Sequence, residues 1–280
     1  MASRVVIAAN LLKVVLLLAG VCAALGGLGW WLGGYRTLSI VVFALLLTAA
    51  AGYWYSDRVV VGMLGARELT QAEAPALHST VERLAGAARV AKPRLYLLPD
   101  GHPRAAAAGR GPRGSALLVS RGLLGALPPA ELEGVVAHEL AHVQSRDVLV
   151  QSIAVVTATA LVELSRIGGF LSRALLFVLG PVAAAIEHVL LSPKRELAAD
   201  RAAAALCGSP HGLADALIRL EQAGELVEFR GNPATEPLYT FNPFAPEGLA
   251  NLFVTHPPLG ERVRRLRALD PDWRERLRAA

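Results

Sequence analysis

Four apolar stretches dominate the pattern of hydrophobic and polar positions, and they fall into two pairs. The first pair, residues 11–32 and 38–55, is joined by a connector so short that only a hairpin fits. Each stretch is long enough for a helix to cross a bilayer. Both stretches close on aromatic residues of the kind that anchor helix ends at membrane interfaces, namely Trp30, Trp31, Tyr53, Trp54 and Tyr55. The pattern predicts a transmembrane hairpin within residues 1–56.

A cleaved signal peptide is the alternative for residues 11–32. This stretch is long, has no clear cleavage site and is followed at once by a second apolar stretch, so we favour a retained helix. Arg4 and Lys13 precede the hairpin and Arg58 follows it, whereas its connector holds only Arg36. By the positive-inside rule, both ends of the hairpin face the cytoplasm.

The second pair of apolar stretches, residues 148–164 and 174–191, predicts a second transmembrane hairpin within residues 148–191. Arg166 and Arg173 lie in the turn between them. These stretches are shorter than the first pair and contain several polar residues, namely Thr157, Thr159, Glu163, Glu187 and His188. Two buried helices of a soluble bundle are therefore the alternative.

Two polar segments, residues 57–147 and 192–280, follow the two hairpins, and we expect them to form the two parts of one domain. Residues 73–90 repeat apolar positions at helical spacing. Residues 93–98 and 115–120 are rich in the residue types of short strands and are bounded by turn residues. The predicted fold is mainly α with a small β-sheet.

The candidate chemistry lies in a helix predicted for residues 127–147. His138 and His142 are four residues apart and therefore share one face of this helix, with Glu139 beside them. Zinc hydrolases use this H-E-x-x-H arrangement because two neutral imidazoles can hold the metal on one helix face. The glutamate then takes a proton from the water that attacks a carbonyl group.

A chance occurrence, with both histidines simply hydrogen-bonded in the core, is the alternative to a metal site. A tetrahedral site needs a third protein ligand, and Glu196 in a helix predicted for residues 192–208 would complete a His₂Glu set. Asp200 faces the same way one turn later and is placed to accept a hydrogen bond from the second nitrogen of a ligand imidazole. Ordinary surface ion pairs with Lys194 or Arg195 are the alternative for these two acids.

Composition favours a membrane protein and argues against a nucleic-acid partner. The mean hydropathy is +0.43, and 54% of the 280 residues are hydrophobic, which is too apolar for an ordinary soluble domain. The net charge of +5 comes from arginines that are spread through the polar segments, a distribution that suits a lipid bilayer better than nucleic acid. Cys22 and Cys207 lie in different kinds of segment, so we expect no structural disulfide.

Several features occur in the same order as in the HtpX-like membrane zinc metallopeptidases, relatives of the CAAX prenyl protease, and the chain resembles that family. They are the motif from His138 to His142, the hydrophobic hairpin after it, and the sequence Glu196-Leu197-Ala198-Ala199-Asp200. The tail also matches, through residues 241–244 and 252–262. The resemblance runs through nearly the whole chain.

The resemblance implies a gluzincin fold, one zinc ion per chain and an active site on the cytoplasmic side of the inner membrane. It also implies protein or peptide substrates, above all misfolded membrane proteins, and a part in quality control or the stress response. In relatives such as the CAAX prenyl protease, a histidine and an arginine flank the zinc and contact the oxyanion or the substrate backbone. His256 and Arg262 occupy the matching positions.

One stretch departs from the family pattern. Residues 102–113 are punctuated by Gly and Pro and either run along a sheet edge or stay mobile. Where the family has an Asn-Ala-Phe-Ala strand that pairs with substrate, this chain has Arg104-Ala105-Ala106-Ala107. The change leaves the zinc chemistry intact but puts the cleavage preference in doubt.

We therefore predict an integral membrane zinc endopeptidase in which Glu139 acts first as base and then as acid. An intramembrane-cleaving metalloprotease is one alternative, but the polar ends of the motif helix place its site at the membrane surface. A catalytically inactive, zinc-stabilised scaffold is the other. Glu139 argues against it, because a purely structural site is closed by a fourth ligand and needs no base.

Overall fold

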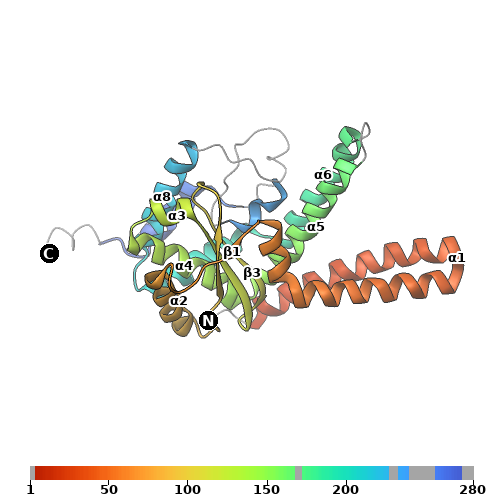
Figure 1. The fold of residues 1–280 in the computed structure, drawn as a ribbon, viewed down its shortest axis with the longest axis horizontal. Helices are drawn as coiled ribbons and strands as arrows, with labels where there is room; N and C mark the ends of the chain where they lie inside the picture. The colour runs from red at the N-terminus through yellow and green to blue at the C-terminus, as the bar shows by residue number, and fades with distance from the viewer. Residues whose placement is uncertain (1–3, 168–171, 227–232, 240–255, 273–280) are drawn as a thin grey trace.

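The computed structural model describes residues 4–167, 172–226, 233–239 and 256–272, and it is mainly helical with a small sheet, as predicted (Figure 1). The helices are α1 Arg4–Met63, α2 Pro75–Ala88, α3 Arg121–Ala126, α4 Pro129–Ser145, α5 Asp147–Ile167, α6 Ser172–Leu190, α7 Pro193–Cys207, α8 His211–Leu226 and α9 Leu259–Arg267. The strands are β1 Arg67–Glu68, β2 Arg94–Leu98, β3 Ala105–Gly111 and β4 Gly114–Ser120, and a 3₁₀ helix, η2, spans Pro233–Leu238.

The sheet has the strand order β1-β2-β4-β3, with β2 parallel to β4 and β3 antiparallel to β4. Residues 102–113 therefore contain an edge strand, which is the first of the two alternatives that their sequence left open. The β3–β4 hairpin needs glycine at Gly109, where φ is +122° and an added Cβ would lie 2.5 Å from the carbonyl oxygen of Gly114. Predicted strands at 93–98 and 115–120 appear as β2 and β4.

The two faces of the sheet pack against different helices because side chains alternate along each strand. Leu117 and Val119 of β4 point into the main core, which also contains residues of α2, α4, α7, α8 and α9. Leu118 points to the opposite face, where it meets Val60 at the end of α1 and Val155 of α5. The sheet thus lies between the helices that carry the candidate chemistry and the ends of the two hairpins.

Both predicted hairpins are helical, and both project from the same side of the sheet-containing part, to the right in Figure 1. Gly33 and Gly34 have non-helical backbone angles, so α1 folds back on itself at this point. Helices α5 and α6 form the second hairpin, and α5 also packs against α1. In the part of the chain that the structure describes, no helix is both long enough and apolar enough to be a candidate membrane span.

Helix α4 lies between α7 and α8, and close packing makes this possible. An added Cβ at Gly134 would lie 2.5 Å from the backbone nitrogen of Leu213, so α4 and α8 approach more closely than a larger side chain allows. Helix α7 begins at Pro193 after the capping residue Ser192 and ends at Gly208 in a left-handed conformation. These contacts set the face of α4 that carries His138 and His142 against the face of α7 that carries Glu196, the predicted third ligand.

Candidate metal and active site

Three side chains predicted as metal ligands converge where α4 and α7 meet. The Nε2 atoms of His138 and His142 are 3.2 Å apart. The carboxylate of Glu196 reaches both rings, with Oε2 lying 3.4 Å from Nε2 of His138 and Oε1 lying 3.4 Å from Nε2 of His142. All three residues are buried, and their ligand atoms lie within 4.8 Å of one another.

These separations fit a zinc site. A tetrahedral zinc ion with bonds of about 2.0–2.2 Å holds its ligand atoms about 3.3–3.6 Å apart. Two imidazole nitrogens and a carboxylate facing one point in a buried space also create a strong demand for a cation there. The His₂Glu set supplies three ligands, which is the number found in catalytic zinc sites that keep one position open.

Each ligand histidine has its own carboxylate behind it. Nδ1 of His138 lies 3.0 Å from Oδ1 of Asp200. Nδ1 of His142 lies 3.3 Å from Oδ2 of Asp147, the first residue of α5. Such carboxylates hold a ligand imidazole in the tautomer and orientation that leave the other nitrogen for the metal.

Sequence reasoning missed Asp147 and treated it only as part of the polar end of the motif helix. The residue before it, Arg146, ends α4 with a φ of 62°, and this left-handed turn brings the aspartate back towards His142. The sequence signal that could have revealed Asp147 was an acidic residue five positions after His142, at the junction of two helices. Its burial to 3% exposure could be seen only in three dimensions.

Arg262 lies behind Asp200. Its Nε and Nη2 atoms donate hydrogen bonds of 2.9 and 2.7 Å to the two carboxylate oxygens, and the residue is 1% exposed. The sequence placed Arg262 near the oxyanion or the substrate backbone, whereas the structure directs these two donors to Asp200. Arg262, Asp200 and His138 therefore form a continuous chain of contacts that leads to the ligand atoms.

His256 reaches the same site from far along the chain. Its Nε2 atom lies 3.6 Å from Oε2 of Glu196. Residues 240–255, which include the matched stretch 241–244, lie outside the described part of the chain.

Glu139 is 3% exposed and sits beside His138 on α4. Burial lowers the pKa of Arg262, but Asp200 above all, and then the charges of Glu196 and Glu139, outweigh burial and raise it.

The electrostatic balance favours ionised carboxylates around a cation. Burial raises the pKa of Glu196, but the charges of His142 and His256 outweigh it and hold the pKa well below its ordinary value. Burial likewise opposes ionisation of Asp200, yet Arg262 lowers its pKa to about 2. Burial lowers the pKa of His142, but Glu196 and then Asp147 raise it to about 10. Without a metal, the site would therefore hold a proton at this imidazole.

Comparison with known proteins identifies the family. The model of peptidase family M48 matches residues 71–270, which include both helices of the site. The chain belongs to peptidase family M48. Membership makes it a zinc metallopeptidase, as the sequence predicted, and the residues that converge between α4 and α7 are those that could hold the metal.

Relatives within family M48 match over almost their whole length. A protein described as "Protease HtpX homolog" from Pelotomaculum thermopropionicum is 40% identical over 278 residues, which cover 93% of this chain and 99% of the relative. A protein of the same description from Pyrococcus abyssi is 38% identical, covering 90% of this chain and 93% of the relative. The predicted resemblance to HtpX-like peptidases is confirmed.

A solved structure shares the fold. The crystal structure of S. mikatae Ste24p superposes with a TM-score of 0.50 at 19% identity, covering 94% of this chain and 66% of that longer chain. The M48 fold therefore extends beyond the motif helices to most of the chain.

Residues 104–107, which depart from the family pattern, are buried. Arg104 is buried, its guanidinium pairs with Asp100 and the hydroxyl of Tyr239, and its Cζ lies 4.8 Å from the centre of the Tyr239 ring. Ala106 of the edge strand β3 forms an isolated bridge with Tyr239. In this chain the arginine thus ties the start of β3 to the region of η2.

Proposed function

We propose that this M48 peptidase is a membrane-bound endopeptidase with one zinc ion per chain, which cleaves misfolded membrane proteins and other protein substrates at the cytoplasmic face of the inner membrane. The convergence of His138, His142 and Glu196 beside Glu139 carries the catalytic part of the proposal. The apolar stretches of the hairpins, their aromatic ends and the flanking basic residues support the membrane part.

Zinc, when bound, supplies a Lewis acid that polarises the scissile carbonyl and makes water acidic enough to attack near neutral pH. His138, His142 and Glu196 would hold this ion. Glu139 accepts the proton of the attacking water and returns it to the leaving amine. This proton transfer requires a carboxylate adjacent to the metal ligands. The buried setting of Glu139 keeps this proton transfer away from bulk water.

The other residues of the site position groups or stabilise charge. His256 donates a hydrogen bond to the substrate oxygen on which negative charge develops, which lowers the energy of the transition state more than that of the substrate. Asp147 and Asp200 orient the two ligand imidazoles. Arg262 holds Asp200 through two hydrogen bonds, so we assign it a positioning role.

Cleavage by metal-reconstituted protein tests the catalytic proposal. The chain is purified in detergent without metal, zinc is added, and cleavage of an unfolded protein is followed for the wild type, Glu139→Gln and Glu196→Ala. We expect the first two to bind about one zinc per chain but only the wild type to cleave, whereas Glu196→Ala loses zinc and activity together. Cleavage by Glu139→Gln at the wild-type rate would refute its role as base.

Reporter fusions test the membrane proposal. A reporter placed after Tyr55 should report cytoplasm, and one inserted at residues 33–37 should report the opposite side, because the connector carries only one basic residue. A reporter in the turn at residues 165–173 decides the second hairpin. A cytoplasmic signal there would leave a single membrane hairpin.

A further inference from the structure

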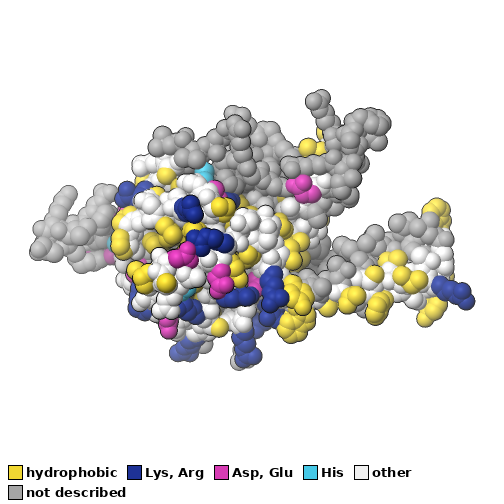
Figure 2. Space-filling model, viewed as in Figure 1, with side chains coloured by type: hydrophobic (Ala, Val, Ile, Leu, Met, Phe, Trp, Pro, Cys, Tyr) yellow, Lys and Arg dark blue, Asp and Glu magenta, His cyan; other side chains and the backbone are white. Residues whose placement is uncertain are grey.

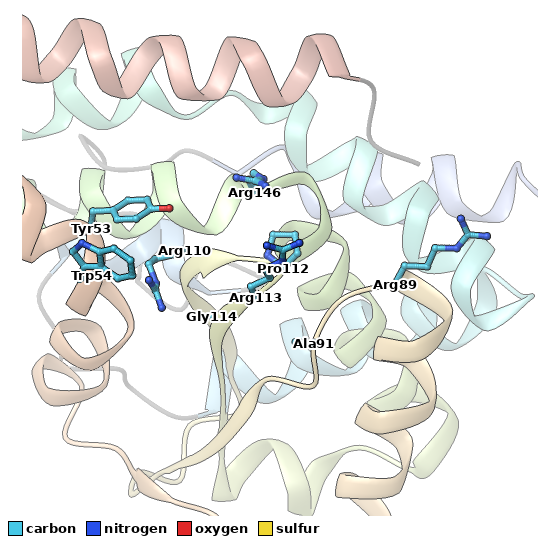
Figure 3. A pocket seen from close by; sticks show the side chains of 9 residues that line it. All are labelled: Tyr53, Trp54, Arg89, Ala91, Arg110, Pro112, Arg113, Gly114 and Arg146. Carbon is cyan, nitrogen blue, oxygen red and sulfur yellow. The ribbon is translucent and has the colours of Figure 1, made fainter.

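A basic cleft, whose lining includes none of the metal ligands, opens at the base of the α1 hairpin (Figure 3). Its volume is about 820 Å³. Tyr53 and Trp54 of α1 form one wall. Arginines from three other segments complete it, and they are Arg89 at the end of α2, Arg110 and Arg113 in the β3–β4 hairpin, and Arg146 at the end of α4. Segments far apart in the sequence therefore bring Arg110, Arg113 and Arg146 to one hollow, whereas the side chain of Arg89 extends away from the others (Figure 3).

The charge of the cleft is basic throughout its described lining. Among the residues that the structure describes, none of the four arginines forms an ion pair with an Asp or Glu side chain, and no acidic residue lines the cleft. The nearby carboxylate of Asp57 is engaged by Arg94. Like charges around one concave surface repel one another and raise the local concentration of anions. The cleft is therefore electrostatically prepared for a negatively charged ligand.

Packing holds two of these side chains in place. The guanidinium Cζ of Arg110 lies 4.6 Å from the ring centre of Trp54 and 5.8 Å from that of Tyr53. Arg146 lies over Gly111, where an added Cβ would come within 3.1 Å of its Cγ atom. Arg89 and Arg146 both have left-handed backbone conformations that end their helices. The side chains of Arg110 and Arg146 are thus held by packing, whereas Arg89 and Arg113 are exposed.

We propose that this cleft binds the phosphate headgroup of an anionic phospholipid. Guanidinium groups bind phosphate oxygens through paired hydrogen bonds. Tyr and Trp prefer the headgroup level of a bilayer, and here they belong to the apolar helix α1. Tyr53 and Trp54 are 40% and 59% exposed, and Figure 2 shows hydrophobic side chains gathered beside basic ones at the base of α1.

A lipid explains the cleft better than a free phosphate does, because the glycerol and acyl groups of a lipid would contact the aromatic wall of the cleft. The inference rests on the membrane location in the proposed function. Bound lipid would hold the β3–β4 hairpin and the end of α4 against the bilayer surface. Arg146 of the cleft is followed directly by Asp147, so the cleft and the metal site share one helix junction.

Binding to the full-length chain in neutral detergent tests this inference. Short-chain phosphatidylglycerol and phosphatidylcholine are titrated separately, and bound lipid is counted by native mass spectrometry. The variant Arg110→Gln/Arg113→Gln removes two charges from the cleft. Arg121→Gln/Arg264→Gln is the matched control, because both residues are exposed and have no carboxylate partner among the described side chains.

The wild type should bind phosphatidylglycerol more tightly than phosphatidylcholine. Loss of two arginines at about 1 kcal/mol each should weaken phosphatidylglycerol binding about 20- to 30-fold. The control variant should stay within about twofold of wild type. Unchanged binding by the cleft variant, or an equal loss in the control, would overturn the inference. Inorganic phosphate that binds as tightly as the lipid would instead identify a free-phosphate site and refute the lipid assignment.

The two proposals fail in distinguishable ways. Recovery of the chain from cells without detergent, or absence of zinc-dependent cleavage, would contradict the proposed function. A chain that fractionates with membranes and cleaves its substrate, but binds lipid independently of Arg110 and Arg113, would contradict the lipid site alone.

Discussion

Asp147 lies directly behind the ligand His142, with its Oδ2 atom 3.3 Å from Nδ1 of the ring. Asp200 holds the equivalent place behind His138 at 3.0 Å. The two carboxylates come from different helices, α5 and α7, so the two rings are oriented independently. Arg262 in turn donates hydrogen bonds to both carboxylate oxygens of Asp200.

Asp147→Asn should weaken zinc binding by roughly ten- to a hundred-fold while leaving the fold intact, because it removes the charge that orients His142. Competition with a zinc chelator measures the affinity, and circular dichroism checks the fold. Glu221→Gln at an exposed position of α8 is the control and should bind zinc as the wild type does. Wild-type affinity in Asp147→Asn would mean that the contact with His142 has no part in metal binding.

Arg262→Met should lower the free energy of unfolding by about 3–5 kcal/mol, because it leaves the buried carboxylate of Asp200 without its partner. Asp200 contributes stability that is present above its ordinary pKa and lost as the pH falls through about 2, so the comparison belongs near neutral pH. Denaturant unfolding in detergent measures the change.

The double variant Asp200→Asn/Arg262→Met separates the contribution of the Asp200–Arg262 ion pair to stability from that of side-chain packing. It removes both charges, so its loss of stability should be smaller than the sum of the two single losses. Simple additivity would show that the two side chains do not depend on each other.

His256→Ala should keep its zinc and its fold yet lose about 10²–10³ in kcat, the usual loss for one donor to a developing oxyanion. The ring lies 3.6 Å from Oε2 of Glu196, so zinc content must be measured in parallel. Unchanged turnover with normal zinc content would remove His256 from the catalytic machinery. Loss of zinc along with activity would assign it to metal binding instead.

Cys207 should resist alkylation. Burial and the nearby charge of Glu133 raise the pKa of its thiol to about 11, so at pH 8 the reactive thiolate is about 100-fold scarcer than at the ordinary pKa. In a Cys22→Ser background, labelling with iodoacetamide should be slow at pH 8 and speed up as the pH approaches 11. Denatured protein is the control, and equally fast labelling of the native chain at pH 8 would contradict the burial of Cys207 between α7 and α4.

The sequence by itself determined the features that depend on neighbouring residues. Helical spacing put His138 and His142 on one face, and the Pro and Gly residues at the ends of α7 marked the helix that carries Glu196. Short strands and the two hairpins were also predicted, because apolar periodicity and turn residues are local signals. Family resemblance then brought His256 to the site from a distance that no local pattern spans.

Only the tertiary structure decided the contacts that join distant segments. Arg262 turns to Asp200, 62 residues away, because α9 packs against α7 and buries a charge that must be paired. Asp147 reaches His142 because a single left-handed residue reverses the chain between two helices. Residues 102–113 contain an edge strand because β4 offers hydrogen bonds along one side, and the same hairpin supplies two of the arginines of the cleft. Sequence spacing specifies the face on which a side chain lies, but packing alone specifies what that face meets.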